Sequence, residues 1–215
     1  IEKQLNEPLK AHWVDTVKDS SIKGDTQKLY AALMCYLSPW LNRWRGLQIP
    51  LEIMYGEPGS GKSSLFMLRL GILTGRPILR NIPSDMRDWY AGITSTGGMY
   101  VIDNVQFADK GLRQRISDEL CRLITEPDPH IEMRKLYTTS GQAYIPVRTA
   151  FGFTAIMQPF LNADLIQRAA IFEMQAHKEP AGNWVSNQLE KLGREGWIAH
   201  HLVVLHRFFQ LAVGK

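Results

Sequence analysis

The sequence predicts an α/β fold in which a parallel sheet is flanked by helices. An apolar run at 51–55 is followed by a glycine-rich loop and then by a helical pattern that starts near Lys62. A second apolar run, 99–102, ends in Asp103 and precedes another helical pattern at 110–124. Parallel strands need a crossover between them, usually a helix, so this alternation of strand and helix is typical of parallel sheets.

The glycine-rich loop has the spacing of a phosphate-binding loop. It reads GEPGSGKS and fits G-x-x-x-x-G-K-[ST] between a strand and a helix. Its glycines allow successive N–H groups to turn inward, and the helix that follows adds its positive dipole end. Lys62 is expected on the β- and γ-phosphates, and the Ser63 hydroxyl on Mg²⁺. A loop that binds nucleotide without hydrolysing it is the alternative. The residues expected to bind ATP are Gly56, Glu57, Pro58, Gly59, Ser60, Gly61, Lys62, Ser63 and Ser64.

Asp103 is the second feature with chemical meaning. The strand before it delivers this acid to the carboxyl end of the sheet, where open α/β folds bind nucleotides. Its carboxylate would hold Mg²⁺, directly or through water, opposite Ser63. The sequence therefore predicts ATP and Mg²⁺ as the cofactors.

Periodicity and turn residues place helices before the phosphate loop. Leu29, Leu33 and Leu37 recur on one face of a helix. Ser38 followed by Pro39 is typical of a helix start, so a second, short helix is expected there.

The elements after the loop follow from the same signals. Gly75 is expected just beyond the helix that follows the loop, and Ser84 and Asp109 are expected to cap the next two helices. The helices expected are 28–37, 39–45, 62–73, 85–91, 110–124, 162–168, 184–192 and 195–213, and the strands 51–55, 77–79, 99–102, 131–137, 143–147, 150–156 and 169–174.

Composition is that of a globular protein. The chain has 215 residues, of which 45% are hydrophobic and 21% charged, and a net charge of +4 that permits nucleic-acid binding without requiring it. Cys35 and Cys121 are expected as reduced thiols in apolar surroundings. No leader or membrane-length apolar run is present, so we expect a cytoplasmic location and no membrane. The start at Ile1 suggests a segment of a longer protein. The parts expected are a linker or arm (1–27), the α/β core (28–178) and a helical lid (179–215).

The order of these parts resembles that of AAA+ ATPases. The hairpin inserted before the strand expected at 150–156 is similar to the pre-sensor-1 hairpin of MCM-type and viral superfamily-three helicases. YVIDNVQ, SDELCRLIT, RKLYTTSGQ and ADLIQRA resemble ATPase domains of replication helicases from phages, plasmids and integrated mobile elements. The resemblance covers roughly residues 28–175. It implies a P-loop NTPase fold of AAA+ type with a β-hairpin insertion and a small C-terminal helical lid.

The resemblance also implies roles for single residues. Gln158, or Met157 beside it, falls at the sensor-1 position, although a strand-end cap is the alternative. Arg168 falls at the position of the arginine finger, which reaches a γ-phosphate bound by a neighbouring subunit of a hexameric ring. A surface salt bridge is its alternative. The catalytic residues implied are Lys62, Asp103, Asn104, Gln158 and Arg168, and the metal ligands are Ser63 and Asp103.

The hairpin is where the resemblance places DNA, as a single strand in the central channel of the ring. Its tip carries no Lys or Arg, so the contacts would be polar or made by the arms. A solvated hairpin face is the alternative. The residues implied are Arg134, Lys135, Thr138, Thr139, Ser140, Gly141 and Gln142.

One departure from the family bears on the reaction. Asn104 stands where the family has Glu, and an amide can orient a water molecule but cannot take its proton. Hydrolysis is then slow, or another acid such as Glu119 serves. Two functions stay open: a helicase motor, and an AAA+ loader, transposition regulator or defence ATPase that uses ATP as an assembly switch.

Overall fold

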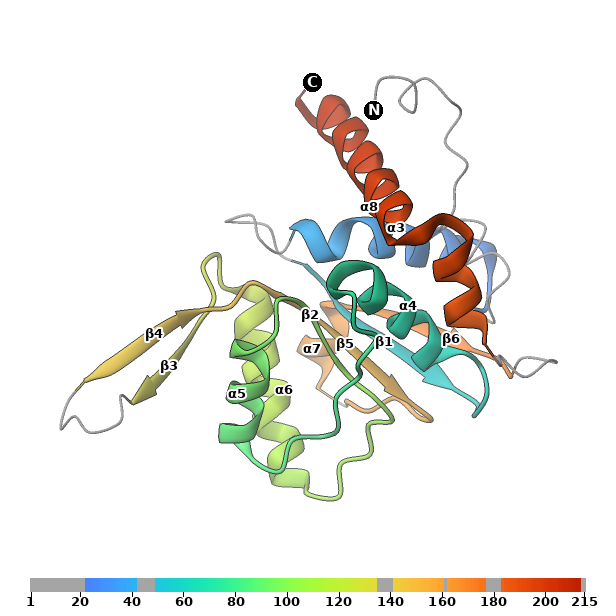
Figure 1. Cartoon of the computed structure of the whole chain (residues 1–215). Helices are drawn as coiled ribbons and strands as arrows, with labels where there is room; N and C mark the ends of the chain where they lie inside the picture. Colours follow the sequence, from blue (N-terminus) through green and yellow to red (C-terminus); the bar gives the residue numbers. More distant parts are fainter. Residues whose placement is uncertain (1–21, 42–48, 135–140, 161, 177–182, 214–215) are drawn as a thin grey trace. The chain divides into compact units, whose positions relative to one another are not determined.

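The structure is a computed structural model, which describes residues 22–41, 49–134, 141–160, 162–176 and 183–213 (Figure 1). Its elements, in chain order, are α3 (Asp25–Leu41), β1 (Leu51–Gly56), α4 (Lys62–Thr74), α5 (Met86–Thr94), β2 (Gly98–Ile102), α6 (Lys110–Thr125), β3 (His130–Arg134), β4 (Gln142–Pro146), β5 (Thr149–Ala155), α7 (Ala163–Gln167), β6 (Ala169–Met174) and α8 (Trp184–Val213).

The central sheet has four strands in the order β2-β5-β1-β6. Both β1 and β2 pair with β5 in parallel, with Tyr55 opposite Ala155 and Ile102 opposite Phe153. The carboxyl ends of these three strands therefore lie at one edge of the sheet. This confirms the predicted α/β fold with a parallel sheet. Residues of β1, β2 and β5 are buried on both faces, as expected for a parallel sheet.

The strand predicted at 77–79 is wrong. Only Arg80 meets the sheet there, as an isolated bridge to Ile102, with its N–H bonded to Val101 O and its carbonyl to Asp103 N. Pro77 and Pro83 flank this segment, and neither has an N–H to extend a ladder.

The chain divides into two compact units. The first takes its described residues from 1–38, 56–78 and 172–215, and the second from 39–55 and 79–171. The predicted division into arm, core and lid stays a prediction.

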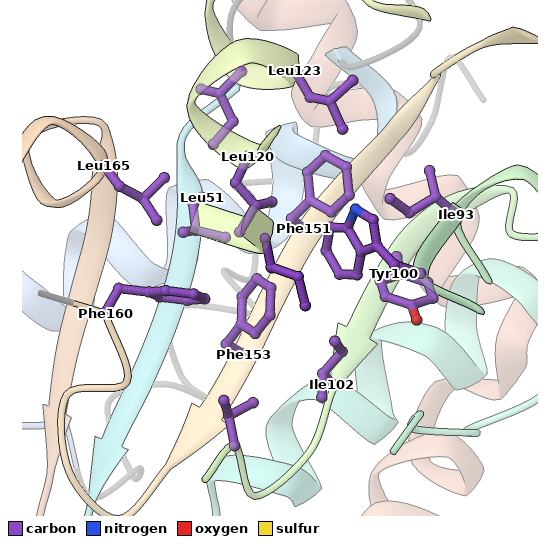
Figure 2. Close-up of a cluster of buried hydrophobic side chains, with 14 of the residues drawn as sticks. Leu51, Ile93, Tyr100, Ile102, Leu120, Leu123, Phe151, Phe153, Phe160 and Leu165 are labelled. Atoms are coloured by element: carbon purple, nitrogen blue, oxygen red, sulfur yellow. The ribbon is translucent and has the colours of Figure 1, made fainter. Parts of the chain in front are cut away.

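The core of the second unit contains a group of packed aromatic rings. Alternate residues of β5 and β2 present Phe151, Phe153 and Tyr100 to α5 and α6 (Figure 2). Trp89 of α5 stacks on Phe151 with ring centroids 6.0 Å apart and meets Tyr100 edge-on at 5.5 Å. The buried face of α6 adds Leu112, Ile116, Leu120 and Leu123 to the same cluster.

Two of the predicted helix ends are confirmed. Asp109 caps α6 by accepting from Gly111 N, and Gly75 ends α4 in the left-handed conformation, both as predicted. The cap predicted at Ser84 is wrong. Asp85 caps α5 instead, because the helix begins at Met86. The Asp85 side chain accepts a hydrogen bond from Asp88 N.

The predicted hairpin is confirmed. β3 and β4 pair antiparallel, with Glu132 opposite Tyr144 and Arg134 opposite Gln142 (Figure 1). Ile131 is buried, whereas the alternate residues of β4 are exposed. One face of the hairpin therefore packs at its base and the other is open.

The first unit contains α3, α4 and α8. A break at Ser38-Pro39 was expected, but α3 continues through it to Leu41, since Ser38 is buried and accepts a bond from Arg69 Nη2 at 2.7 Å rather than capping. Leu29 and Leu33 share one face of α3, as predicted, but this face is open, since the two residues are 55% and 44% exposed.

The two C-terminal helices are confirmed as one helical segment with an interruption. Gly193 lies inside α8 with φ 65, outside the helical range. Next to it, Arg194 donates to the carbonyls of Ile72 and Leu73 at the end of α4, which ties α8 to that helix.

His201 of α8 is buried against Tyr36. Burial, with Arg69 and His200 nearby, lowers its pKa to about 3. A depressed pKa means that the unfolded chain takes up the proton first, so the stabilising effect is complete above about pH 6.5 and is lost as pH falls toward 3.

We expect His201→Phe to remove part of the acid sensitivity of the fold. Below pH 6.5 the parent should lose about 1.4 kcal/mol of unfolding free energy per pH unit more than the variant. Urea unfolding of both chains between pH 4 and 7 measures this difference, with His206→Phe, at an exposed position, as control. Parallel pH profiles would contradict the prediction.

Candidate nucleotide-binding site

The phosphate loop begins where β1 ends. Gly56 has φ 138, and a Cβ on it would lie 1.9 Å from the carbonyl oxygen of Met174 on β6. Gly59 and Gly61 have φ 74 and 82, which other residues adopt only with strain. The backbone conformation therefore requires glycine at all three positions, and the close approach of Met174 requires it a second time at Gly56.

The ammonium of Lys62 lies inside the loop. It donates to the carbonyls of Gly56 and Glu57 at 2.9 and 2.6 Å and to Ser60 Oγ at 2.9 Å. Its side chain is buried, as is Ser60. A cation held at the centre of a glycine loop is placed to contact a phosphate that enters the loop.

The amino end of α4 opens onto the same loop. Gly61 precedes the helix in the left-handed conformation, and no side chain of the described residues caps it. The first N–H groups of a helix have no partner within the helix, and they attract anions. Glu57 fixes the outer side of the loop, since its Oε2 accepts from Ala176 N at 3.3 Å.

Asp103 follows β2 at the carboxyl edge of the sheet, as predicted. Its Oδ1 accepts from Thr154 Oγ1 at 2.5 Å, and the same Oγ1 accepts from the N–H of Asn104 at 2.7 Å. Val105 N also bonds to the carbonyl of Thr154 at 2.7 Å. Three hydrogen bonds therefore join the chain after β2 to one buried residue of β5.

Thr154 is the residue that sequence reasoning missed. It is the one hydroxyl residue in the apolar run AFGFTA and is the penultimate residue of β5. A polar side chain at the end of an otherwise apolar strand was the available signal. The strand register then brings it beside Asp103, because β5 lies directly next to β2.

The residues predicted at the sensor-1 position lie beyond the strand. Met157 is 78% exposed. Gln158 has a buried Oε1 that has no hydrogen-bond partner among the described residues. Of the polar residues near the end of β5, Thr154 is the one whose side chain bonds Asp103.

Glu119, the alternative acid, is already paired. Both its carboxylate oxygens accept from Arg122, at 3.0 and 2.6 Å, and the same guanidinium bonds Glu126 and the carbonyl of His130. Both oxygens of Glu119 are thus engaged with Arg122, and its role as the alternative acid stays a prediction.

Arg168 lies at the opposite end of the strands. Its carbonyl accepts from the N–H of Leu51, the first residue of β1, and its side chain pairs with Asp164 at 2.7 Å. The guanidinium of Arg168 is the main cause that lowers the pKa of Asp164. Cys121 adjoins this pair, and burial followed by the Asp164 charge raises the pKa of its thiol.

The structure describes only part of the predicted DNA-binding hairpin. Gly141 and Gln142 belong to the described residues, as does the backbone of Arg134. The other positions predicted there lie outside them: Lys135, Thr138, Thr139 and Ser140.

Each of the two predicted metal ligands carries an oxygen of the kind that Mg²⁺ takes from proteins, a hydroxyl on Ser63 and a carboxylate on Asp103. The described residues contain no group of three or more His, Cys, Asp or Glu that would bind a metal alone. Nor do their helices include one long and apolar enough to cross a bilayer.

Comparison with known proteins gives a likeness of fold. The chain is similar to the apo structure of the NrS-1 C-terminal region, with a TM-score of 0.53 and 16% identity over 86% of this chain and 44% of that one. A JCV helicase with a bound acetamide compound has a TM-score of 0.48 and 12% identity, over 92% and 52%. The chain thus spans about half the length of each.

Sequence comparison adds nothing to this. No protein-family model matches the chain, and a search of curated proteins found no match. The sheet order, the phosphate loop and the hairpin give the chain a P-loop NTPase fold.

We expect Thr154→Val to lower stability by about 1–3 kcal/mol, because it removes the partner of both the Asn104 N–H and the Asp103 carboxylate at a partly buried position. Thr154→Ser keeps the oxygen and should cost less than Thr154→Val. Unfolding by urea measures both variants against the parent. Equal stability of the Val and Ser variants would show that the hydroxyl is not what fixes the chain after β2.

Proposed function

We propose that the chain is an Mg-ATP-dependent ATPase of AAA+ type and the motor domain of a DNA replication helicase from a phage or mobile element. The observation that supports this best is the phosphate loop, which holds Lys62 at its centre and starts at the sheet edge where Asp103 ends β2. The fold likeness to the NrS-1 C-terminal region adds support.

In this proposal each group has one task. The loop amides and Lys62 bind the β- and γ-phosphates, and Ser63 and Asp103 hold Mg²⁺, which neutralises phosphate charge. Thr154 fixes the carboxylate of Asp103 through its 2.5 Å hydrogen bond. Asn104 and Gln158 orient the attacking water.

We further propose that Arg168 acts in a neighbouring subunit of a homo-oligomeric, hexameric ring. It lies beside the first residue of β1, whereas the phosphate loop follows the last. A strand of six residues spans about 17 Å, too far for an arginine to reach its own loop. Arg168 is more than a third exposed and held by Asp164, so its guanidinium is accessible to a partner.

A switch without unwinding is the second candidate, and Asn104 is the observation that favours it. Its backbone is left-handed, with φ 50, and its N–H is bonded to Thr154. Its side chain is an amide and not a carboxylate, so it cannot take a proton from the attacking water. Turnover would therefore be slow. Strand displacement on a forked duplex separates the motor from the switch.

We expect Asp103→Asn to abolish ATP hydrolysis while leaving much of the ATP binding, because the loop still holds the phosphates. Lys62→Ala should lose both. The measurements are ATP turnover with Mg²⁺ and nucleotide affinity by fluorescence, with circular dichroism as the folding control. Parental turnover in Lys62→Ala would disprove the assignment of the loop.

We expect Arg168→Ala to bind ATP and lose most turnover, and activity to return when it is mixed with Lys62→Ala chains. At some interfaces the intact loop of the first variant then meets the arginine of the second. ATPase assays on each variant and on the mixture test this, with sedimentation to show mixed oligomers. Mixed oligomers without recovered activity would contradict a role in trans.

A further inference from the structure

The base of the hairpin carries a pocket that the proposed ATPase reaction does not use. Its volume is about 340 Å³, within the range of small-molecule sites. It lies at the carboxyl end of β4 and at the amino ends of β5 and β2. The residues that matter to the argument are Thr94, Thr96, Gly97, Gly98, Pro146 and Arg148.

Two glycines leave one wall of this pocket without side chains. A Cβ on Gly97 or Gly98 would meet no atom within 4 Å, so both point into open space. Gly98 needs its flexibility because its φ is 89, but Gly97 does not have a positive φ. The backbone at Gly97 is therefore open to close approach by a ligand.

Arg148 supplies positive charge to the pocket. Its Nη2 donates to Asp128 Oδ1 at 2.7 Å, which is the one side-chain bond of Arg148 within the described residues. A guanidinium has five N–H donors, so others remain for a phosphate oxygen. Asp128 is more than half exposed and competes with any anion for this guanidinium.

An exposed aromatic ring precedes the pocket on the open face of the hairpin. Tyr144 is 62% exposed, and its hydroxyl donates to Gln142 Oε1 at 3.1 Å. The His130 ring packs against it at 5.6 Å. Tyr144 and Pro146 are two residues apart on β4, so they share a face and are about 7 Å apart.

We propose that this surface binds one nucleotide of a single DNA strand, with its base stacked on Tyr144 and its sugar-phosphate in the pocket beside Gly97 and Arg148. An aromatic ring next to a cationic pocket is the combination used for unpaired bases, because the ring takes any base and the cation takes the backbone. A paired base is already stacked and would not reach the ring.

This proposal rests on the proposed function but assigns the DNA contact to a different part of the hairpin. The predicted residues lie toward the tip and along the arms, whereas the surface here lies at the base. It also gives stacking, rather than charge on the tip, as the main contact. That accounts for a hairpin tip that lacks Lys and Arg.

The stacking contact is tested with a fluorescent oligo-dT and the full chain. Tyr144→Ala should bind about tenfold more weakly at every salt concentration, and Tyr144→Phe should keep the parental affinity. Tyr30→Ala, at an exposed tyrosine of α3, is the matched control and should not change binding. An oligonucleotide of abasic sites should bind the parent and Tyr144→Ala equally.

The pocket is tested by filling it and by changing its charge. Gly97→Leu should weaken oligo-dT binding without changing the circular dichroism spectrum. Arg148→Gln should weaken binding and reduce the salt dependence by about one phosphate contact. Asp128→Asn should strengthen binding, because it releases Arg148. Arg115→Gln, at an exposed arginine of α6, should leave the effect of Gly97→Leu unchanged.

The outcomes separate this proposal from the proposed function. If the parent does not bind oligo-dT at any salt concentration, both fail. If the parent binds and Tyr144→Ala and Gly97→Leu bind equally well, the subsite is wrong and the function stands. A change in oligomeric state by sedimentation would make the surface a protein interface. Loss of free ATP affinity in Gly97→Leu would make the pocket a mononucleotide site. Either result overturns the proposal.

Discussion

The candidate site depends on one structural constraint: β5 lies between β1 and β2 and pairs with both in parallel. Because of this arrangement, the ends of all three strands meet at one edge, and Thr154 lies beside Asp103. A one-residue slip of β5 would turn Thr154 to the other face of the sheet and remove its bonds to Asp103 and Asn104. In this register the aromatic side chains of β5 are buried in the core cluster with α5 and α6.

The parts of the fold that the sequence predicted are those with a local cause. The phosphate loop is contiguous, so its glycines, Lys62 and the start of α4 were all visible in one stretch. The apolar period of α6 and its cap at Asp109 are likewise local. The errors fall where a distant contact decides: Ser38 was expected to cap a helix, and Arg69 of another helix makes it an interior residue instead.

Thr154 and the pairing of Glu119 illustrate what sequence alone could not give. Thr154 gains its role from the strand beside it, and the order of strands in a sheet is not written in any one of them. Glu119, the alternative acid of the prediction, has both its oxygens bound by Arg122, one helical turn away. The spacing of Glu119 and Arg122 was visible in the sequence. Whether Glu119 bonds Arg122 or water, however, depends on the burial of the helix face that carries both residues.

The left-handed backbone of Asn104 limits which side chains this position can carry. Asn and Asp tolerate that conformation better than other residues with a Cβ, whereas a longer acid there costs about 1–2 kcal/mol. A single substitution of Asn104 to Glu would therefore place a carboxylate here only at the cost of backbone strain or of a new path for the chain after β2. The least costly acid at this position is Asp, whose carboxylate reaches one carbon less far.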